Sequence, residues 1–280
     1  MEGYERHAQR PLRAFRVEGI EAPVAPGRGI EAALRNDRRV ALGGLAAVVL
    51  LAWFYLWRSA AGMDHAAMAM SAMPRAADPS VLALTFVMWT VMMTGMMLPS
   101  AAPAILLYGA LVRKNGARGT VLPGVWIFAG AYLLVWTGFS VTATLLQTLL
   151  ESASLLTPAM AAASTGLSAL ALVAAGVYQL TPLKQTCLNK CRNPLEFFVT
   201  RWRAGRAGAF TMGLEHGAYC VGCCWALMLL LFVAGVMNLA WVALIAAFVF
   251  AEKLLPAGRL VSHSAGAVLI LSGIWVLAGI

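Results

Sequence analysis

Long apolar segments alternate with short polar stretches from Val40 onward. A transmembrane helix needs about 20 predominantly apolar residues to cross about 30 Å of hydrocarbon, and seven of these segments approach that length. The pattern therefore predicts an all-α, polytopic membrane helix bundle. The seven helices are expected at residues 40–57, 81–111, 121–148, 160–182, 209–236, 239–255 and 262–280.

Lysine and arginine lie mainly between the expected helices. Residues 1–39 contain eight arginines, six acidic residues and three prolines, which is typical of a partly disordered tail next to a membrane. The loops after the second, fourth and sixth expected helices are also basic. Because cytoplasmic loops carry an excess of Lys and Arg, we expect the N-terminal tail 1–39 to be cytoplasmic and the transmembrane domain to span 40–280.

Composition supports the same class. Of the 280 residues, 61% are hydrophobic and only 12% are charged, and the mean hydropathy is +0.77, which is too apolar for a soluble domain. The net charge of +9 reflects the basic loops, so it indicates membrane topology and not a nucleic-acid partner. We expect a multi-pass protein of the cytoplasmic (inner) membrane, with the lipid bilayer as its main partner.

A ten-residue stretch of the fifth expected helix contains five groups able to bind a metal: Glu215, His216, Cys220, Cys223 and Cys224. At 100° per residue, His216, Cys220 and Cys223 share one face, and the other two flank it. Ionisable and reactive side chains are costly in lipid, so they indicate a functional site. Thiolate and imidazole bind zinc and monovalent copper, Cu(I). Alternatively, the cysteines pack as small apolar residues where nearby glycines let a neighbouring helix approach.

Methionines in the second expected helix are the next candidates. Met93, Met96 and Met97 repeat the spacing of the three cysteines, and their patch is expected at a similar depth in the membrane. Thioether ligands favour copper over zinc. The alternative is that methionine fills irregular gaps in the core. Pro99 and Pro103 leave backbone carbonyls without intrahelical donors, which requires neighbours to satisfy them.

Two further cysteines, Cys187 and Cys191, are spaced i, i+4 in a basic loop. Because the cytosol is reducing, they predict a metal relay or a redox pair, or else inert thiols, and not a structural disulfide. Glu252 is a candidate ligand or proton carrier; alternatively it ends the sixth helix by pairing with Lys253 or by reaching the interface.

The loop after the first expected helix is rich in soft donors. Thioethers on an exterior loop suit Cu(I), and the alternative is a flexible loop in a methionine-rich protein. The candidate ligands there are His65, Met68, Met70 and Met73.

These motifs resemble a bacterial family of predicted metal-binding integral membrane proteins, a domain-of-unknown-function family. The resemblance covers about residues 80–280 and rests on four stretches: Trp89 with the methionines before Pro99, 217–228 with its Cys-Val-Gly-Cys-Cys-Trp core, 235–238, and 252–258. It implies a metal-binding membrane protein without an established reaction, and it does not include the loop with His65.

The leading hypothesis is a membrane protein that binds a soft metal, copper ahead of zinc, and transports or delivers it to a metallochaperone or membrane-complex partner. The alternatives are a membrane thiol oxidoreductase and a structural or assembly subunit. The sequence contains no nucleotide-binding loop and no Ser-His-Asp constellation, so an ATP-driven pump or serine hydrolase is not expected, and a non-enzymatic role is favoured.

Overall fold

The structure, a computed structural model, describes residues 28–66, 78–115, 121–157 and 160–279. These residues are almost entirely helical, and their one β-bridge, between Leu156 and Ala162, is isolated. The helices are α1 Arg28–Ala66, α2 Pro79–Lys114, α3 Leu122–Ser152, α4 Thr165–Leu180, α5 Pro182–Arg192, α6 Pro194–Arg201, α7 Gly205–Leu229, α8 Leu231–Ala234, α9 Leu239–Leu254 and α10 Gly258–Ala278.

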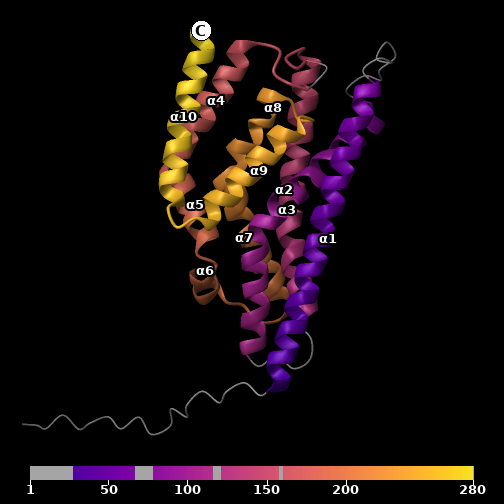
Figure 1. Ribbon diagram of the computed structural model, residues 1–280, viewed down its shortest axis with the longest axis vertical. Coiled ribbons are helices and arrows are strands. Elements are labelled where there is room, and N and C mark those ends of the chain that lie inside the picture. The colour runs from indigo at the N-terminus through magenta and orange to yellow at the C-terminus, as the bar shows by residue number, and fades with distance from the viewer. Residues whose placement is uncertain (1–27, 67–77, 116–120, 158–159, 280) are drawn as a thin grey trace, which may run out of the picture.

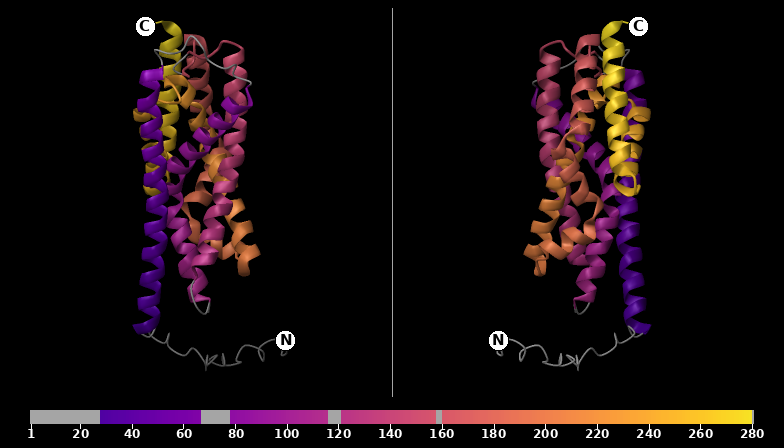
Figure 2. Two further views of the ribbon diagram at one scale, coloured as in Figure 1. Left: turned by 90° about the vertical axis from the view of Figure 1, so that its right-hand side faces the viewer. Right: turned by 90° about the vertical axis from the view of Figure 1, so that its left-hand side faces the viewer.

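The helices form an elongated bundle (Figure 1). The helix α3 packs on α7 and on α2, α1 packs along α2, and α4 pairs with α10 at the opposite side of the bundle. The short helix α5 packs against α7, which places residues 182–192 next to the cysteine-rich stretch. The two further views show the C-terminus at the end of the bundle opposite to the start of α1 (Figure 2).

Five helices among the described residues are long and apolar enough to cross a membrane, and α4 with α5 forms a sixth span if the bent pair counts as one. The protein is therefore an all-helical membrane protein. The predicted count of seven is not confirmed, because the segment expected at 239–255 is the 16-residue helix α9, which is only about 24 Å long.

Two of the differences from the predicted boundaries are large. The first helix already begins at Arg28, within the expected tail, because the prolines of that tail all precede this point. The segment expected at 160–182 instead forms α4 and continues as α5 after a bend of 65°. Pro182 cannot donate to the α4 ladder, and the Thr181 hydroxyl accepts from Lys184 N and caps a new helix.

Pro99 interrupts the hydrogen bonding of α2, as expected. The Gly95 carbonyl four residues earlier has no donor within the helix, and it accepts a hydrogen bond of 3.3 Å from Trp53 Nε1 of α1. A neighbouring helix thus satisfies the carbonyl. The loop methionines Met68, Met70 and Met73 lie outside the described residues, as does the side chain of His65 at the end of α1.

Close packing of α7 on α3 sets the position of the cysteines. A Cβ atom on Gly213 would lie 2.4 Å from the Phe128 carbonyl oxygen, and one on Gly217 would lie 3.0 Å from Val135 Cβ. Only glycine permits such an approach, which is the small-residue packing common in membrane helices. One turn further along α7, Cys220 consequently faces Tyr132 of α3.

Candidate metal centre

Sulfur atoms from three helices meet inside the bundle. Cys224 Sγ of α7 lies 3.9 Å from Met97 Sδ of α2, and Cys223 Sγ of α7 lies 3.9 Å from Cys191 Sγ of α5. Together with Cys220, these residues form the sulfur cluster, and all five are buried. Soft donors that are far apart in the sequence are therefore brought to one place. Of the three methionines expected near the cysteines, Met97 contacts one of them.

Within α7 the thiols bond only weakly to the backbone. Cys223 Sγ and Cys224 Sγ lie 3.1 Å and 2.9 Å from the Cys220 carbonyl oxygen, which is the geometry of i, i+3 and i, i+4 contacts. A thiol is a weak donor, so these bonds contribute little. A metal ion can replace them at low cost.

Cys220 has two polar partners from other helices. Lys253 Nζ of α9 lies 2.9 Å from the Cys220 sulfur and donates to Ser100 Oγ of α2 at 3.0 Å. The Tyr132 hydroxyl of α3 lies 2.9 Å from the same sulfur. A buried ammonium in lipid requires compensation. Lys253 is thus placed to balance the charge of a Cys220 thiolate, the form of cysteine that binds metals.

His216 lies one turn before Cys220, inside an aromatic shell. Its ring centroid is 5.4 Å from that of Phe197, 5.9 Å from Phe128 and 6.0 Å from Tyr132. In the described part of the chain, the buried Nδ1 atom has no hydrogen-bond partner. An unpaired buried nitrogen is unusual, and it is chemically suited to act as a metal ligand.

Glu215 lies away from the sulfur cluster. Its carboxylate pairs with Arg203 at 3.2 Å and with Arg201 at 3.6 Å, and its side chain is 23% exposed. The residue therefore belongs to a basic, partly exposed surface next to α6. The 100° step between neighbouring residues turns Glu215 outward while His216 points inward.

Glu252 is buried but binds a cation from another helix. Its Oε1 atom lies 2.7 Å from Lys184 Nζ of α5, and both side chains are fully buried. Adjacent residues on a helix do not face each other, so Glu252 and Lys253 contact different neighbours and not one another. Its carboxylate points to α5, whereas the Lys253 ammonium points to Cys220.

The remaining candidates surround the cluster. Met93 and Met96 are buried on α2 within about one turn of Met97. Cys187 is partly buried, and its sulfur would lie 2.8 Å from a Cβ atom on Gly222, so it packs against the backbone of α7. Cys187 is not among the sulfur pairs described above.

Sequence reasoning missed the polar residues that surround Cys220. Tyr132 and Ser100 carry no signal, because both residue types occur widely in membrane helices. Lys184 belongs to the basic loop expected after the fourth helix, although the bend at Pro182 turns its side chain into the bundle. The sequence signal for Lys253 was its position at the end of an apolar helix.

The described residues contain no group of three or more His, Cys, Asp or Glu side chains arranged to hold a metal. The donors that do approach one another are thiols and a thioether. These are soft ligands that select Cu(I), whereas structural zinc sites use four Cys, His or carboxylate ligands. The donor chemistry fits copper, and the zinc hypothesis gains no support.

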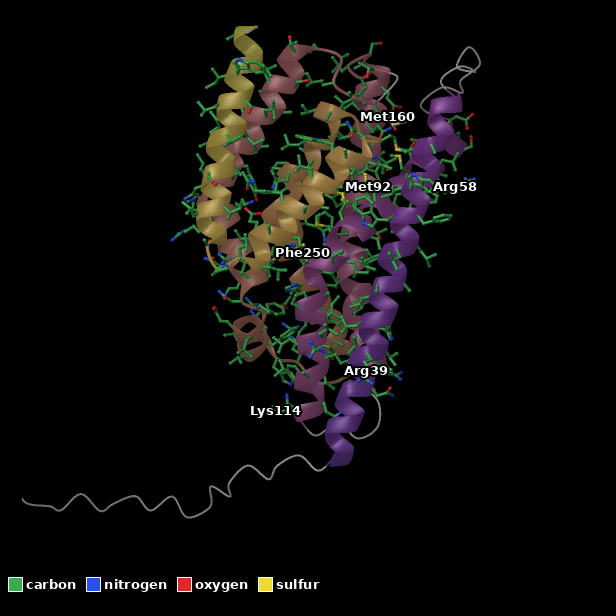
Figure 3. All side chains as sticks on the ribbon, in the orientation of Figure 1. Arg39, Arg58, Met92, Lys114, Met160 and Phe250 are labelled. Carbon is green, nitrogen blue, oxygen red and sulfur yellow. The ribbon has the colours of Figure 1, made fainter. Side chains whose placement is uncertain are left out.

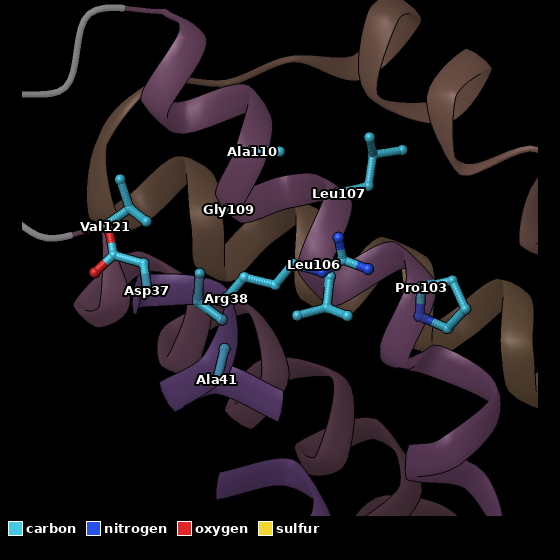
Figure 4. Close-up of a pocket in the computed structure, with 10 residues that line it drawn as sticks. Asp37, Arg38, Ala41, Pro103, Leu106, Leu107, Gly109, Ala110 and Val121 are labelled. Atoms are coloured by element: carbon cyan, nitrogen blue, oxygen red, sulfur yellow. The ribbon is translucent and has the colours of Figure 1, made fainter. Parts of the chain in front are cut away.

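A separate cavity of about 530 Å³ lies between α1, α2 and α3 (Figure 4). Its lining includes Arg38, Pro103, Leu106 and Val121, and the Asp37–Arg113 ion pair lies beside it. Since the lining is mainly apolar and includes no sulfur atom, this cavity is not part of the candidate metal centre.

The fold and the sulfur cluster define a helical membrane protein with soft-metal donors in its core. A family model described as PpoB2, copper chaperone, matches residues 86–276. The match covers more than half of the chain, so the protein belongs to this copper chaperone family. The match supports a copper-related family, but it does not confirm the domain-of-unknown-function family that the sequence motifs resemble. No curated protein and no solved structure matches the chain.

Proposed function

We propose that the protein binds Cu(I) in the cytoplasmic (inner) membrane and transports it or delivers it to a partner protein. The observation that carries the proposal is the convergence of thiols and a thioether from α2, α5 and α7, with the Cys224–Met97 contact at 3.9 Å as its centre. Soft sulfur ligands select Cu(I). Membership of a copper chaperone family supports the same metal.

The orientation follows from charge. Arg39 and Lys114 lie at the same end of the bundle (Figure 3), which we call the basic end. The positive-inside rule supports a cytoplasmic location for this end. Cys191 lies between the basic residues Lys190 and Arg192 on α5, and we infer that copper enters the sulfur cluster from the basic end. A cytoplasmic metallochaperone or a membrane-complex partner would dock there.

Each residue of the centre has a distinct role in this proposal. Cys220, Cys223 and Cys224 supply thiol ligands from α7, and Cys191 and Met97 supply sulfur from the facing helices. In the metal-free protein, Lys253 compensates the charge at Cys220. If Cu(I) were held by Cys220 and a second thiolate, one negative charge would remain, which the Lys253 ammonium would balance while it keeps its hydrogen bond to Ser100. His216 is a further ligand if its ring turns toward the metal.

Metal analysis tests the proposal directly. Full-length protein purified under reducing conditions and supplied with Cu(I) or Zn(II) should retain stoichiometric copper, and X-ray absorption should show sulfur ligands. Cys220→Ala and Cys223→Ser should each lower copper retention by about tenfold or more. Cys187→Ser is the matched control, since the sulfur pairs of the cluster join Cys223 to Cys191 and Cys224 to Met97 and do not include Cys187. Copper retention that is equal in all variants would overturn the proposal.

A second candidate is a thiol oxidoreductase, favoured by the distance of 3.9 Å between Cys191 Sγ and Cys223 Sγ. These cysteines belong to different helices, so a disulfide between them avoids the constraints of cysteines on one helix. It still requires the sulfurs to approach to about 2.05 Å. Mass spectrometry of alkylated protein would detect a reversible Cys191–Cys223 bridge in metal-free protein. Persistently free thiols after exposure to a quinone oxidant would exclude this role.

A further inference from the structure

Five methionines of α2 are buried, and we call Met88, Met92, Met93, Met96 and Met97 the α2 methionines. Residues four apart on a helix are neighbours, so Met97 is followed by Met93, and Met96 by Met92 and Met88. The series rises about 14 Å along the helix from the sulfur cluster. Figure 3 shows Met92 between Lys114 at the basic end and Met160 near the opposite end.

A buried hydrogen-bond network lies where the α2 methionines end. Trp89 Nε1 donates to Gln147 Oε1 of α3 at 2.7 Å. The Gln147 amide in turn donates to Glu151 Oε1 at 2.8 Å and to Met160 Sδ at 3.4 Å. Gln147 is only 1% exposed. The network therefore connects the outer part of α2 to a thioether and a carboxylate.

The backbone of Met160 is unusual. Its φ is +56°, a conformation that is strained for a residue with a side chain. Glycine would adopt it freely. Two backbone hydrogen bonds hold it there: Met160 N donates to Thr157 O at 2.8 Å, and Val236 N donates to Met160 O at 3.4 Å. The strained backbone directs the thioether toward Gln147.

We propose that Met160 and Glu151 form a second, outer Cu(I) site, which the α2 methionines supply with copper from the sulfur cluster. This inference rests on the proposed function, and it adds a route for Cu(I) through the bundle and a site from which Cu(I) is released. The thioether is a soft ligand, and the carboxylate balances the charge of a monovalent cation. In the metal-free protein the Met160 sulfur accepts a weak bond from the Gln147 amide, which Cu(I) replaces.

The outer site is tested in full-length protein that lacks the inner ligands. The variant Cys220→Ser/Cys223→Ser/Cys224→Ser should bind Cu(I) weakly under reducing conditions, measured by competition with bathocuproine disulfonate. Adding Met160→Leu should weaken this residual binding by about tenfold or more, a loss of about 1.4 kcal/mol. Adding Met212→Leu, a buried methionine of α7 outside the α2 series, should leave it unchanged.

A second measurement keeps the proposal testable if the triple variant does not fold. Copper-loaded single variants are mixed with excess bathocuproine disulfonate, and the release of Cu(I) is followed. Met160→Leu should slow release by about fivefold or more without altering the copper content, whereas Met212→Leu should behave as wild type. Equal release from both variants would overturn the outer site alone. Failure of the wild type to retain Cu(I) would instead overturn the proposed function.

Discussion

The ammonium nitrogen of Lys253 lies 2.9 Å from the sulfur of Cys220, although the two residues are on different helices. A lysine inside a membrane bundle is costly unless its charge is compensated. Lys253 also donates a hydrogen bond to Ser100, and the Tyr132 hydroxyl lies 2.9 Å from the Cys220 sulfur. The contacts around Cys220 therefore favour a thiolate at this position.

Replacing Lys253 with methionine should make Cys220 less reactive. The variant keeps a long side chain but removes the positive charge, and the thiolate is the form that reacts. Alkylation of Cys220 by N-ethylmaleimide, followed by mass spectrometry, should slow by about tenfold. Cys187 in the same sample is the internal reference. Equal rates at Cys220 in variant and wild type would show that Lys253 does not activate the thiol.

Removing one partner of the Lys184–Glu252 pair should destabilise the protein strongly. Both side chains are fully buried, so Glu252→Gln leaves an unpaired ammonium inside the bundle. The expected loss is about 3–5 kcal/mol in the free energy of unfolding, measured by denaturant titration in detergent. The double variant Lys184→Met/Glu252→Leu should recover most of this loss. A double variant that is as unstable as Glu252→Gln would contradict charge burial as the cause.

Adding one methyl group at Gly213 should separate α7 from α3. The new Cβ atom would lie 2.4 Å from the Phe128 carbonyl oxygen, so the helices must shift. We expect Gly213→Ala to cost about 1–3 kcal/mol of stability and to reduce copper retention at Cys220. The matched control is Gly130→Ala on α3, where nothing lies within 4 Å of the added atom. Similar stability of the two variants would refute the tight contact.

Trp53 should stabilise α2 next to Pro99. Trp53→Phe removes the donor to the Gly95 carbonyl and leaves that oxygen unsatisfied, at an expected cost of about 1–3 kcal/mol. Thermal unfolding in detergent measures this change. Trp57→Phe on the same helix is the control, because Trp57 is 57% exposed. An equal shift in Tm for both variants would mean that the hydrogen bond contributes nothing.

Much of the local structure could be predicted because it depends on short-range physics. The hydrocarbon thickness sets the length of an apolar helix, so the run of apolar segments identified a helical membrane protein. The 100° step of a helix placed Cys220 and Cys223 on one face, and both are buried. The need to satisfy the carbonyl released by Pro99 was likewise foreseen, although its donor Trp53 was not.

Contacts between helices were decided by tertiary packing. The pairs Cys191–Cys223, Met97–Cys224 and Lys253–Cys220 join residues whose separation along the chain carries no information about their distance in space. The bend after Leu180 turned a basic loop segment into the helix α5, one face of which is buried. These relationships depend on where glycines let helices approach and on which buried charges find partners. The sequence thus determined the helices and their reactive faces, whereas only the packed bundle determined which faces meet.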